Sequence, residues 1–137
     1  MSKRKAFGFN VAVRNLDEAV AKYKTLLEIE PKIIESHEFA FPGLRGACFD
    51  LHGFKINLIT SVDKGTSIDL FLEKKGDGFF LFSLEVDDIK GEVERLREAN
   101  FIFTPKDPVE TEKWGKVIFI HPKSLNGIQL EMIQPKQ

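Results

Sequence analysis

The sequence predicts an α+β fold of two tandem βαβββ modules, whose strands form a curved mixed sheet that encloses a cup-shaped cavity. Two repeated patterns support this prediction. Residues 51–59 (LHGFKINLI) and 125–133 (LNGIQLEMI) each combine a turn dipeptide with alternating apolar and polar residues, which is typical of a strand entered from a tight turn. Residues 7–13 and 80–86 share a second pattern, an alternating strand that leads into a helix.

The two patterns recur at nearly the same spacing, which makes the chain a tandem repeat. Leu81 follows Gly8 by 73 residues, and Glu131 follows Asn57 by 74. An internal repeat indicates that one supersecondary unit occurs twice. We therefore predict a single domain over residues 1–137, with repeat one at about 5–61, a connector at about 62–78 and repeat two at about 79–134.

The first repeat is expected to run strand, helix, strand, strand, strand. Its first strand is Ala6–Val13. In the helix that follows, Asn15 and Glu18 have the spacing of a capping box, and Pro31 prevents the helix from continuing. The other strands are expected at Lys32–Glu38, Ala47–Leu51 and Phe54–Thr60, the last two as a hairpin across His52 and Gly53.

The connector and the second repeat follow the same logic. Ser61–Gly78 contains turn signals around a short stretch at Ile68–Leu72 that is either helical or extended. The second repeat begins with a strand at Phe79, followed by a helix over about Asp88–Ala99. Its other elements are expected to be a strand at Phe101–Thr104 cut short by Pro105, a polar loop at Asp107–Gly115, and strands at Lys116–His121 and Gly127–Ile133.

Composition and charge exclude several classes of protein. The formal net charge is −1, so nothing indicates a nucleic-acid groove or binding to an anionic membrane. No apolar run is long enough to span a bilayer, and no signal region follows the N-terminal charges. The single cysteine, Cys48, has no partner for an internal disulfide and is expected to fill space in the core. These features predict a cytoplasmic protein with neither nucleic acid nor membrane as a partner.

Alternation also predicts which side chains face the cup. They are Gly8, Asn10, Ala12, Lys55, Asn57, Ile59, Leu81, Ser83, Glu85, Gln129, Glu131 and Ile133. A largely apolar pocket with a few convergent polar groups is typical of a small-molecule site. We therefore predict that the ligand-binding residues are Asn10, Asn57, Leu81, Ser83, Gln129, Glu131 and Trp114. For Trp114, a role as a lid or rim group competes with a role as an anchor at the edge of the core.

Several stretches resemble the vicinal oxygen chelate superfamily, which includes glyoxalases, extradiol dioxygenases and bleomycin-resistance proteins. Within it, they are most similar to the methylmalonyl-CoA epimerases. The stretches are Val13–Ala19 (VRNLDEA), Phe71–Gly78 (FLEKKGDG), Glu85–Ile89 (EVDDI), and His121–Lys123 with the later Gly127 and Glu131. The resemblance implies the two-module fold. It also implies that catalytic members hold a divalent metal in the cup, through ligands at equivalent positions of the two modules.

Most of the metal ligands that the resemblance implies are replaced in this chain. The four ligand positions correspond to Gly8, Asn57, Leu81 and Glu131, so only the final carboxylate matches. The glutamate that epimerases are thought to use as an acid or base corresponds to Phe41. Catalytic divalent metals usually take three protein ligands from His, Asp, Glu or Cys. None of the three histidines lies at a predicted cup position, although the pattern leaves the face of His37 open. We therefore predict no metal site and no cofactor.

Two functions remain open at this point. The preferred one is a metal-free protein of the bleomycin-resistance type, which binds a small molecule in the cup without catalysis. The alternative is an enzyme, a divergent methylmalonyl-CoA epimerase-like or glyoxalase-like isomerase or lyase that uses Glu131. Glu131 itself has two alternative roles. In one, it is a functional carboxylate whose pKa is raised by its apolar surroundings. In the other, it is structural, and is either neutralised by Lys55 or hydrogen-bonded by Asn10, Asn57 or Gln129.

The predicted sheet also has exposed strand edges, which need to be covered. We therefore predict a homodimer.

Overall fold

The computed structural model describes residues 3–136, in which eight β-strands, three α-helices and two 3₁₀ helices are assigned. These elements confirm the α+β fold. The chain packs as two compact units: Gly8–Phe80, and a second unit made of residues 3–7 and 81–136 of the described chain. Strands β1 (Arg4–Ala12) and β5 (Gly78–Val86) supply residues to both units. Over residues 3–136, no helix is long and apolar enough to cross a membrane.

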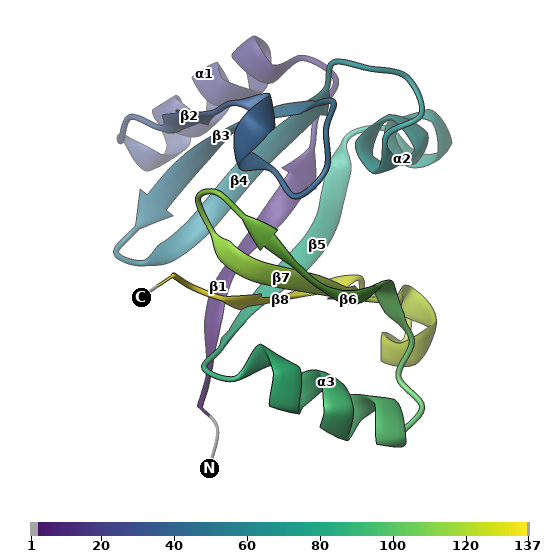
Figure 1. Ribbon diagram of the computed structural model, residues 1–137. Helices are drawn as coiled ribbons and strands as arrows, with labels where there is room; N and C mark the ends of the chain where they lie inside the picture. Colours follow the sequence, from purple (N-terminus) through teal and green to yellow (C-terminus); the bar gives the residue numbers. More distant parts are fainter. Residues whose placement is uncertain (1–2, 137) are drawn as a thin grey trace. The chain divides into compact units, whose positions relative to one another are not determined.

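In the first unit, four strands lie in the order β2-β3-β4-β1 (Figure 1). Strand β1 pairs with β4 in parallel, whereas β3 pairs with β2 and with β4 in antiparallel fashion. The unit is therefore a mixed sheet. Its elements after β1 are α1 (Leu16–Leu27), β2 (Lys32–Ile34), η1 (Ser36–Glu38), β3 (Leu44–Leu51), β4 (Phe54–Ser61) and α2 (Ser67–Lys75).

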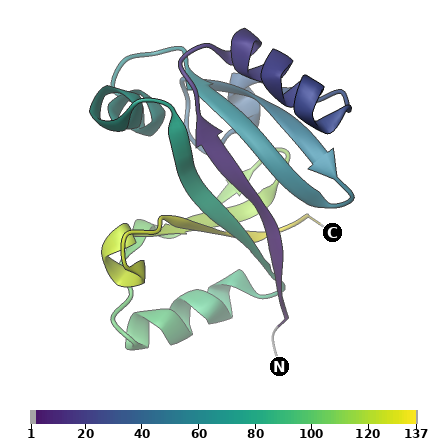
Figure 2. The ribbon, with the colours of Figure 1, turned by 180° about the vertical axis from the view of Figure 1, so that it is seen from behind.

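The second unit repeats this arrangement with the strand order β5-β8-β7-β6 (Figure 2). Strand β5 pairs with β8 in parallel, and β7 pairs with β8 and with β6 in antiparallel fashion. The tandem repeat is thus confirmed at the level of strand pairing. Its elements after β5 are α3 (Ile89–Glu98), β6 (Phe103–Thr111), β7 (Gly115–Ile120), η2 (Pro122–Leu125) and β8 (Leu130–Gln134).

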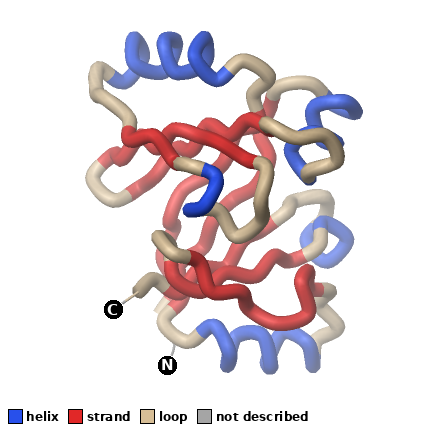
Figure 3. The backbone as a smooth tube through the Cα atoms, turned by 45° about the horizontal axis from the view of Figure 1, so that its top comes forward, coloured by secondary structure: helices blue, strands red, loops and turns tan. Residues whose placement is uncertain are grey.

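In each module the long helix lies along one face of that module's own strands (Figure 3), and its apolar side chains are buried there. Helix α1 starts where predicted, because the Asn15 side chain accepts a hydrogen bond from the Glu18 backbone N–H at 3.0 Å. Leu16 and Ala19 then pack with Ala47, Phe49 and Leu58 of the sheet. In the second unit, α3 packs Ile89 and Val93 against Val86, Ile118 and Met132. Burying these side chains is the main stabilising contribution of each module.

The face opposite each helix carries the residues predicted to line the cup. In the first unit, Phe49 and Leu58 belong to the α1 core, so alternation turns their neighbours Cys48 and Asn57 to the other face. In the second unit, Leu130 and Met132 belong to the α3 core, so Glu131 points away from α3. These residues therefore lie on the predicted face. Ala12 and Ile59, which were also predicted to line the cup, instead pack in a core with Ile68 and Leu72 of α2.

Several element boundaries differ from the predictions, and local hydrogen bonds account for the end of β2 and for α2. Strand β2 ends at Ile34, because Glu35 and Glu38 cap each other in a 3₁₀ turn and the Ser36 hydroxyl donates to the Leu44 carbonyl oxygen at 2.6 Å. The predicted strand up to Glu38 was therefore wrong at its end. The stretch left open at Ile68–Leu72 is helical, because the Thr66 hydroxyl caps α2 by accepting from the Asp69 N–H at 3.0 Å.

Strand β6 continues past Pro105, where it was expected to stop. Thr104 pairs with Phe119, and after a register shift Val109 pairs with Val117. β6 is the outermost strand of its unit, so its prolines need not donate to a neighbouring strand. The predicted Asp107–Gly115 loop shrinks to the turn between β6 and β7. Strand β8 begins at Leu130, three residues later than predicted, because the turn after η2 (Pro122–Leu125) continues: the N–H groups of Gly127 and Ile128 donate to the carbonyl oxygens of Pro122 and Leu125.

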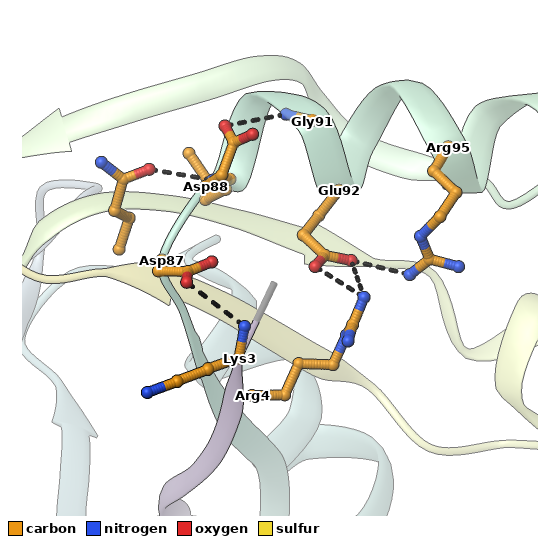
Figure 4. A network of polar contacts seen from close by, with 9 residues as sticks. Lys3, Arg4, Asp87, Asp88, Gly91, Glu92 and Arg95 are labelled. Carbon is orange, nitrogen blue, oxygen red and sulfur yellow. Dashed lines mark hydrogen bonds and ion pairs between the residues drawn. The ribbon is translucent and has the colours of Figure 1, made fainter. Parts of the chain in front are cut away.

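A buried carboxylate joins the start of β1 to α3 within the second unit (Figure 4). The Glu92 side chain is 2% exposed, and both of its oxygens face Arg4, at 3.0 and 2.8 Å. Arg95 lies one turn further along α3 and donates to the same carboxylate at 2.7 Å. A buried charge is tolerated only when it is paired and hydrogen-bonded. Arg4 and Arg95 therefore offset the cost of removing the Glu92 carboxylate from water.

Replacing Arg4 with Met should therefore destabilise the protein. The expected loss in free energy of unfolding is about 1–2 kcal/mol, because Arg95 still pairs with Glu92 and Arg4 is partly exposed. Urea denaturation of both proteins measures this difference. Lys22→Met is the control: it removes an exposed ion pair with Glu18 and should change stability by less than about 0.5 kcal/mol. Equal stabilities for Arg4→Met and wild type would contradict this role.

Candidate functional site

Glu131 and Ser83 form a hydrogen-bonded pair on the face of the second unit opposite α3. The parallel pairing of β5 with β8 sets Ser83 directly beside Glu131. The Ser83 hydroxyl donates to Oε1 of Glu131 at 2.5 Å. Ser83 is 1% exposed, whereas Glu131 is only partly buried. On the other side of Glu131, strand β7 places Phe119 in register with it. The Glu131 carboxylate therefore has a hydroxyl group hydrogen-bonded to one of its oxygens, from Ser83 on β5, and an aromatic residue, Phe119, as its neighbour on β7.

This environment shifts the protonation of Glu131. Desolvation raises its pKa from 4.5 to about 6, and the hydrogen bond from Ser83 opposes part of that rise. A carboxyl group with a pKa near 6 exchanges its proton readily at neutral pH. Shifted pKa values of this kind are typical of groups that act as acids or bases. The first of the two roles considered for Glu131, a carboxylate in apolar surroundings, agrees with this environment.

The equivalent pair in the first unit is Asn10 and Asn57, which lie side by side on β1 and β4. The Asn57 Nδ2 donates to the Asn10 Oδ1 at 3.0 Å. Both residues are 8% exposed. The pair occupies the same register as Ser83 and Glu131 but contains no ionisable group. The two modules therefore present one ionisable pair and one neutral pair at matching positions.

The other predicted site residues lie in different settings. Leu81 is 1% exposed and lies two residues before Ser83 on β5, and Gln129 is half-buried just before β8. The Trp114 ring packs edge-on against Phe7 at 5.9 Å between ring centroids, which corresponds to the core-edge role. Lys113 lies over the same ring at 5.1 Å from Nζ to centroid. His37, left open before, is exposed on η1.

Two neighbours of these pairs were not among the predicted site residues. Phe119 lies opposite Glu131 on β7, and Cys48 lies opposite Asn57 on β3. Alternation along the predicted strands indicates their faces, but it does not indicate which strand lies next to which. Lys55, considered as a partner for Glu131, instead lies 3.6 Å from Asp50 and donates to the Gly53 carbonyl oxygen.

Comparison with known proteins places this fold in a family. The model of the Glyoxalase/Bleomycin resistance protein/Dioxygenase superfamily matches residues 9–119. The chain therefore belongs to this superfamily, as its repeat and strand pairing suggested. An ethylmalonyl-CoA/methylmalonyl-CoA epimerase from Cereibacter sphaeroides is 32% identical over 129 residues, covering 90% of this chain and 92% of that protein.

Two solved structures are similar to this one. Methylmalonyl-CoA epimerase from Mycobacterium tuberculosis superposes with a TM-score of 0.82 at 25% identity, covering 96% of this chain and 88% of that one. A variant of the Streptomyces coelicolor epimerase, in complex with 2-nitronate-propionyl-CoA, gives a TM-score of 0.81 at 18% identity, covering 96% and 94%. The second likeness supports the fold alone. The named relatives are isomerases, so the preference for a protein without catalysis is not supported.

The prediction that the protein uses no cofactor is corrected by the same comparisons. The relatives are methylmalonyl-CoA epimerases, from a superfamily whose catalytic members typically use a divalent metal. The replacement of those residues shows that this chain lacks the ligand set typical of the family, and it does not show that the protein works without a metal. Kinship with these enzymes therefore overturns the inference from those residues.

The residues present do not reproduce that ligand set. Leu81 supplies no donor atom, and a Cβ added at Gly8 would overlap the Lys55 carbonyl oxygen. Of the four positions, only Asn57 and Glu131 carry side-chain oxygen atoms of the kind that a metal ion could bind. Over residues 3–136, no three His, Cys, Asp or Glu side chains are grouped so that they could hold a metal ion. The chemistry derived from this chain accordingly rests on Glu131 and Ser83, with no step through a metal.

The shifted pKa of Glu131 predicts a pH-dependent contribution to stability. Between pH 4.5 and about 6, the folded protein binds more protons than the unfolded chain, so its stability falls as the pH rises. Glu131→Gln removes this dependence. The variant should match wild type near pH 4.5 and exceed it by about 1–2 kcal/mol at pH 7. Urea denaturation at both pH values, with Glu94→Gln on the exposed side of α3 as the baseline, measures the effect. A difference that does not change with pH would contradict it.

Proposed function

We propose that the protein is an isomerase of acyl-CoA thioesters, of the ethylmalonyl-CoA/methylmalonyl-CoA epimerase type. Membership of the superfamily supports this proposal, as does the epimerase from Cereibacter sphaeroides, which matches almost the full length of both chains. The observation that contributes most from this chain is Glu131, a carboxylate with a pKa near 6 fixed at one oxygen by Ser83. The proposal replaces the family's acid or base glutamate, which corresponds to Phe41, with Glu131.

Glu131 acts as the base on the carbon between the thioester carbonyl and the carboxylate of the substrate. The C–H bond breaks, its electron pair becomes part of an enolate, and the proton moves to the Glu131 carboxylate. A water molecule then donates a proton to the opposite face of that carbon, which gives the epimer. Protonated Glu131 releases its proton to water, which restores the carboxylate, so atoms and charge balance with water as the only other reactant. A base with a pKa near 6 is largely ionised at pH 7 and still basic enough to assist this transfer.

Ser83 determines which oxygen of Glu131 reacts. Its hydroxyl engages Oε1, and over the described residues Glu131 has no further hydrogen bond, so the proton moves to Oε2. The register of β5 against β8 fixes the position of Ser83 beside Glu131.

We also propose that the protein is a single domain and that it forms a homodimer, as the sequence predicts.

Hydrogen exchange at the substrate carbon tests the proposal directly. Wild-type protein in D₂O should incorporate deuterium into methylmalonyl-CoA, as measured by mass spectrometry, and Glu131→Gln should lower the rate at least about a hundredfold. Glu94→Gln serves as the control and should exchange at the wild-type rate. Running the assay after EDTA dialysis and again with added Co²⁺ reveals any requirement for a divalent metal. Equal rates in wild type and Glu131→Gln under both conditions would overturn the assignment of Glu131.

Ser83→Ala should shift the pH dependence of the exchange reaction. The hydrogen bond from Ser83 favours the ionised carboxylate, so its loss raises the pKa of Glu131 further. The acid limb of the kcat/KM profile should then move to higher pH. Ser83→Thr keeps the hydroxyl and should restore the wild-type position. A merely structural role for Ser83 would lower the rate equally at every pH and leave the limb in place.

A further inference from the structure

His121 follows the last residue of β7 and lies on the same sheet face as Glu131. In the ladder between β7 and β8, Phe119 pairs with Glu131. His121 is two residues beyond Phe119, its backbone is still extended, and its N–H donates to the Ile102 carbonyl oxygen at 2.8 Å. Side chains alternate along extended backbone, so His121 shares the face of Phe119. The sequence analysis did not count it among the cup residues, because it is at the end of the predicted strand.

The two ionisable side chains are close neighbours within the second unit. Because Phe119 pairs with Glu131, His121 falls opposite Gln129, two residues before Glu131. Diagonal neighbours of this kind on antiparallel strands are about 7–8 Å apart, within reach of long side chains. His121 is exposed and Glu131 is partly buried, so both have surface that a ligand can contact. A small group bound at Glu131 can therefore reach His121 without leaving this unit.

A hydrogen bond assigns the tautomer of the His121 ring. The Lys123 backbone N–H donates to Nδ1 at 3.0 Å, which caps the start of η2. A ring nitrogen that accepts a hydrogen bond has no proton of its own, so the neutral imidazole has its proton on Nε2. Within residues 3–136, no further hydrogen bond is formed by this ring. The Nε2–H group is therefore a donor that is available to a ligand, on a ring held by the backbone of the same chain.

The proposed reaction requires a donor of this kind. Removal of the proton from the substrate carbon moves negative charge onto the thioester oxygen, and a positioned hydrogen-bond donor stabilises that charge. Gly8 and Leu81, at two of the family's ligand positions, have no side-chain donor. A neutral imidazole can polarise a carbonyl group in this way. It also suits the neighbouring base, because a cation beside Glu131 would lower the pKa of that carboxylate.

We propose that the Nε2–H of His121 donates a hydrogen bond to the thioester oxygen of the substrate, and that this bond strengthens as the enolate forms. The inference rests on the proposed function, because it names a second catalytic residue for the same reaction. The proton stays on Nε2 throughout, and Glu131 alone takes the proton from carbon. One group thus removes the proton and the other stabilises the charge that remains.

His121→Asn separates the two hydrogen bonds of this side chain. The asparagine Oδ1 can accept from Lys123 as Nδ1 does, since Asn is a preferred capping residue, but the shorter side chain has no group in place of the Nε2–H. The variant should keep the wild-type melting temperature, and its rate of deuterium incorporation into methylmalonyl-CoA should fall at least about tenfold. His52→Asn is the matched control: His52 lies in a turn at φ 52°, which Asn tolerates, and the exchange rate should not change.

A charged analogue provides a readout that a structural role would not move. In 2-nitronate-propionyl-CoA, the ligand of the Streptomyces coelicolor complex, negative charge is delocalised next to the thioester as it is in the enolate. By isothermal titration calorimetry, His121→Asn should bind this analogue at least about tenfold more weakly than wild type. Propionyl-CoA lacks the charge, so its affinity should change by less than about threefold.

The outcomes separate this inference from the proposed function. Wild-type protein that does not exchange the substrate hydrogen would overturn the proposed function, and the role of His121 with it. Wild-type exchange in His121→Asn would overturn the role of His121 alone. An equal loss of affinity for the analogue and for propionyl-CoA would attribute the effect to the fold, and would also overturn this role.

A measurement on the wild-type protein covers the case in which His121→Asn does not fold. Long-range ¹H–¹⁵N spectra at pH 7 should show the His121 proton on Nε2 and none on Nδ1. The Nε2 signal should shift when 2-nitronate-propionyl-CoA is added. The opposite tautomer, or an Nε2 signal that stays in place at saturating analogue, would overturn the assignment.

Discussion

Parallel pairing between the first and last strand of each module is the constraint on which the rest of the structure depends. It sets Asn10 beside Asn57 and Ser83 beside Glu131, although 47 and 48 residues separate the members of the two pairs. The side-chain period of a strand is two, so a slip of one residue between β5 and β8 would turn Glu131 into the apolar core under α3. Strand β7 pairs with the other edge of β8 in antiparallel fashion and so helps to keep β8 in this register.

Facing direction was predictable from the sequence, whereas neighbour identity was not. Alternation indicated that Glu131 and Asn57 lie opposite the helices, and both do. The partner of Glu131 is Ser83, which was not among the partners considered for it, because strand order is not encoded in the period of a single strand. The predicted ends of β2 and β6 were wrong for a similar reason, because both depend on interactions with other parts of the chain. One depends on a side chain–backbone hydrogen bond from Ser36, and the other on Pro105 lying in an outermost strand.

The replaced ligand residues favoured a metal-free binding protein, whereas the relatives favour an isomerase. Histidines at the positions of Gly8 and Leu81 would indicate one way to stabilise negative charge on a substrate. Their replacement removes one source of enolate stabilisation, whereas deprotonation of a carbon acid also requires a base of suitable pKa. Glu131 meets that requirement because its surroundings desolvate it while Ser83 limits the shift. The pair in the other module has the same register but no ionisable group, so the duplicated geometry presents different chemical groups in the two modules.

The close approach of β4 to Gly8 has a consequence for how this lineage can change. Any side chain at Gly8 would collide with the Lys55 main chain rather than with a movable side chain. A single codon change to histidine at this position would therefore require the strand pair to separate, at the expense of the ladder that aligns Asn10 with Asn57. Glycine at this position therefore sets a steric limit: every larger residue has to displace main-chain atoms of β4 before its own side chain can be accommodated.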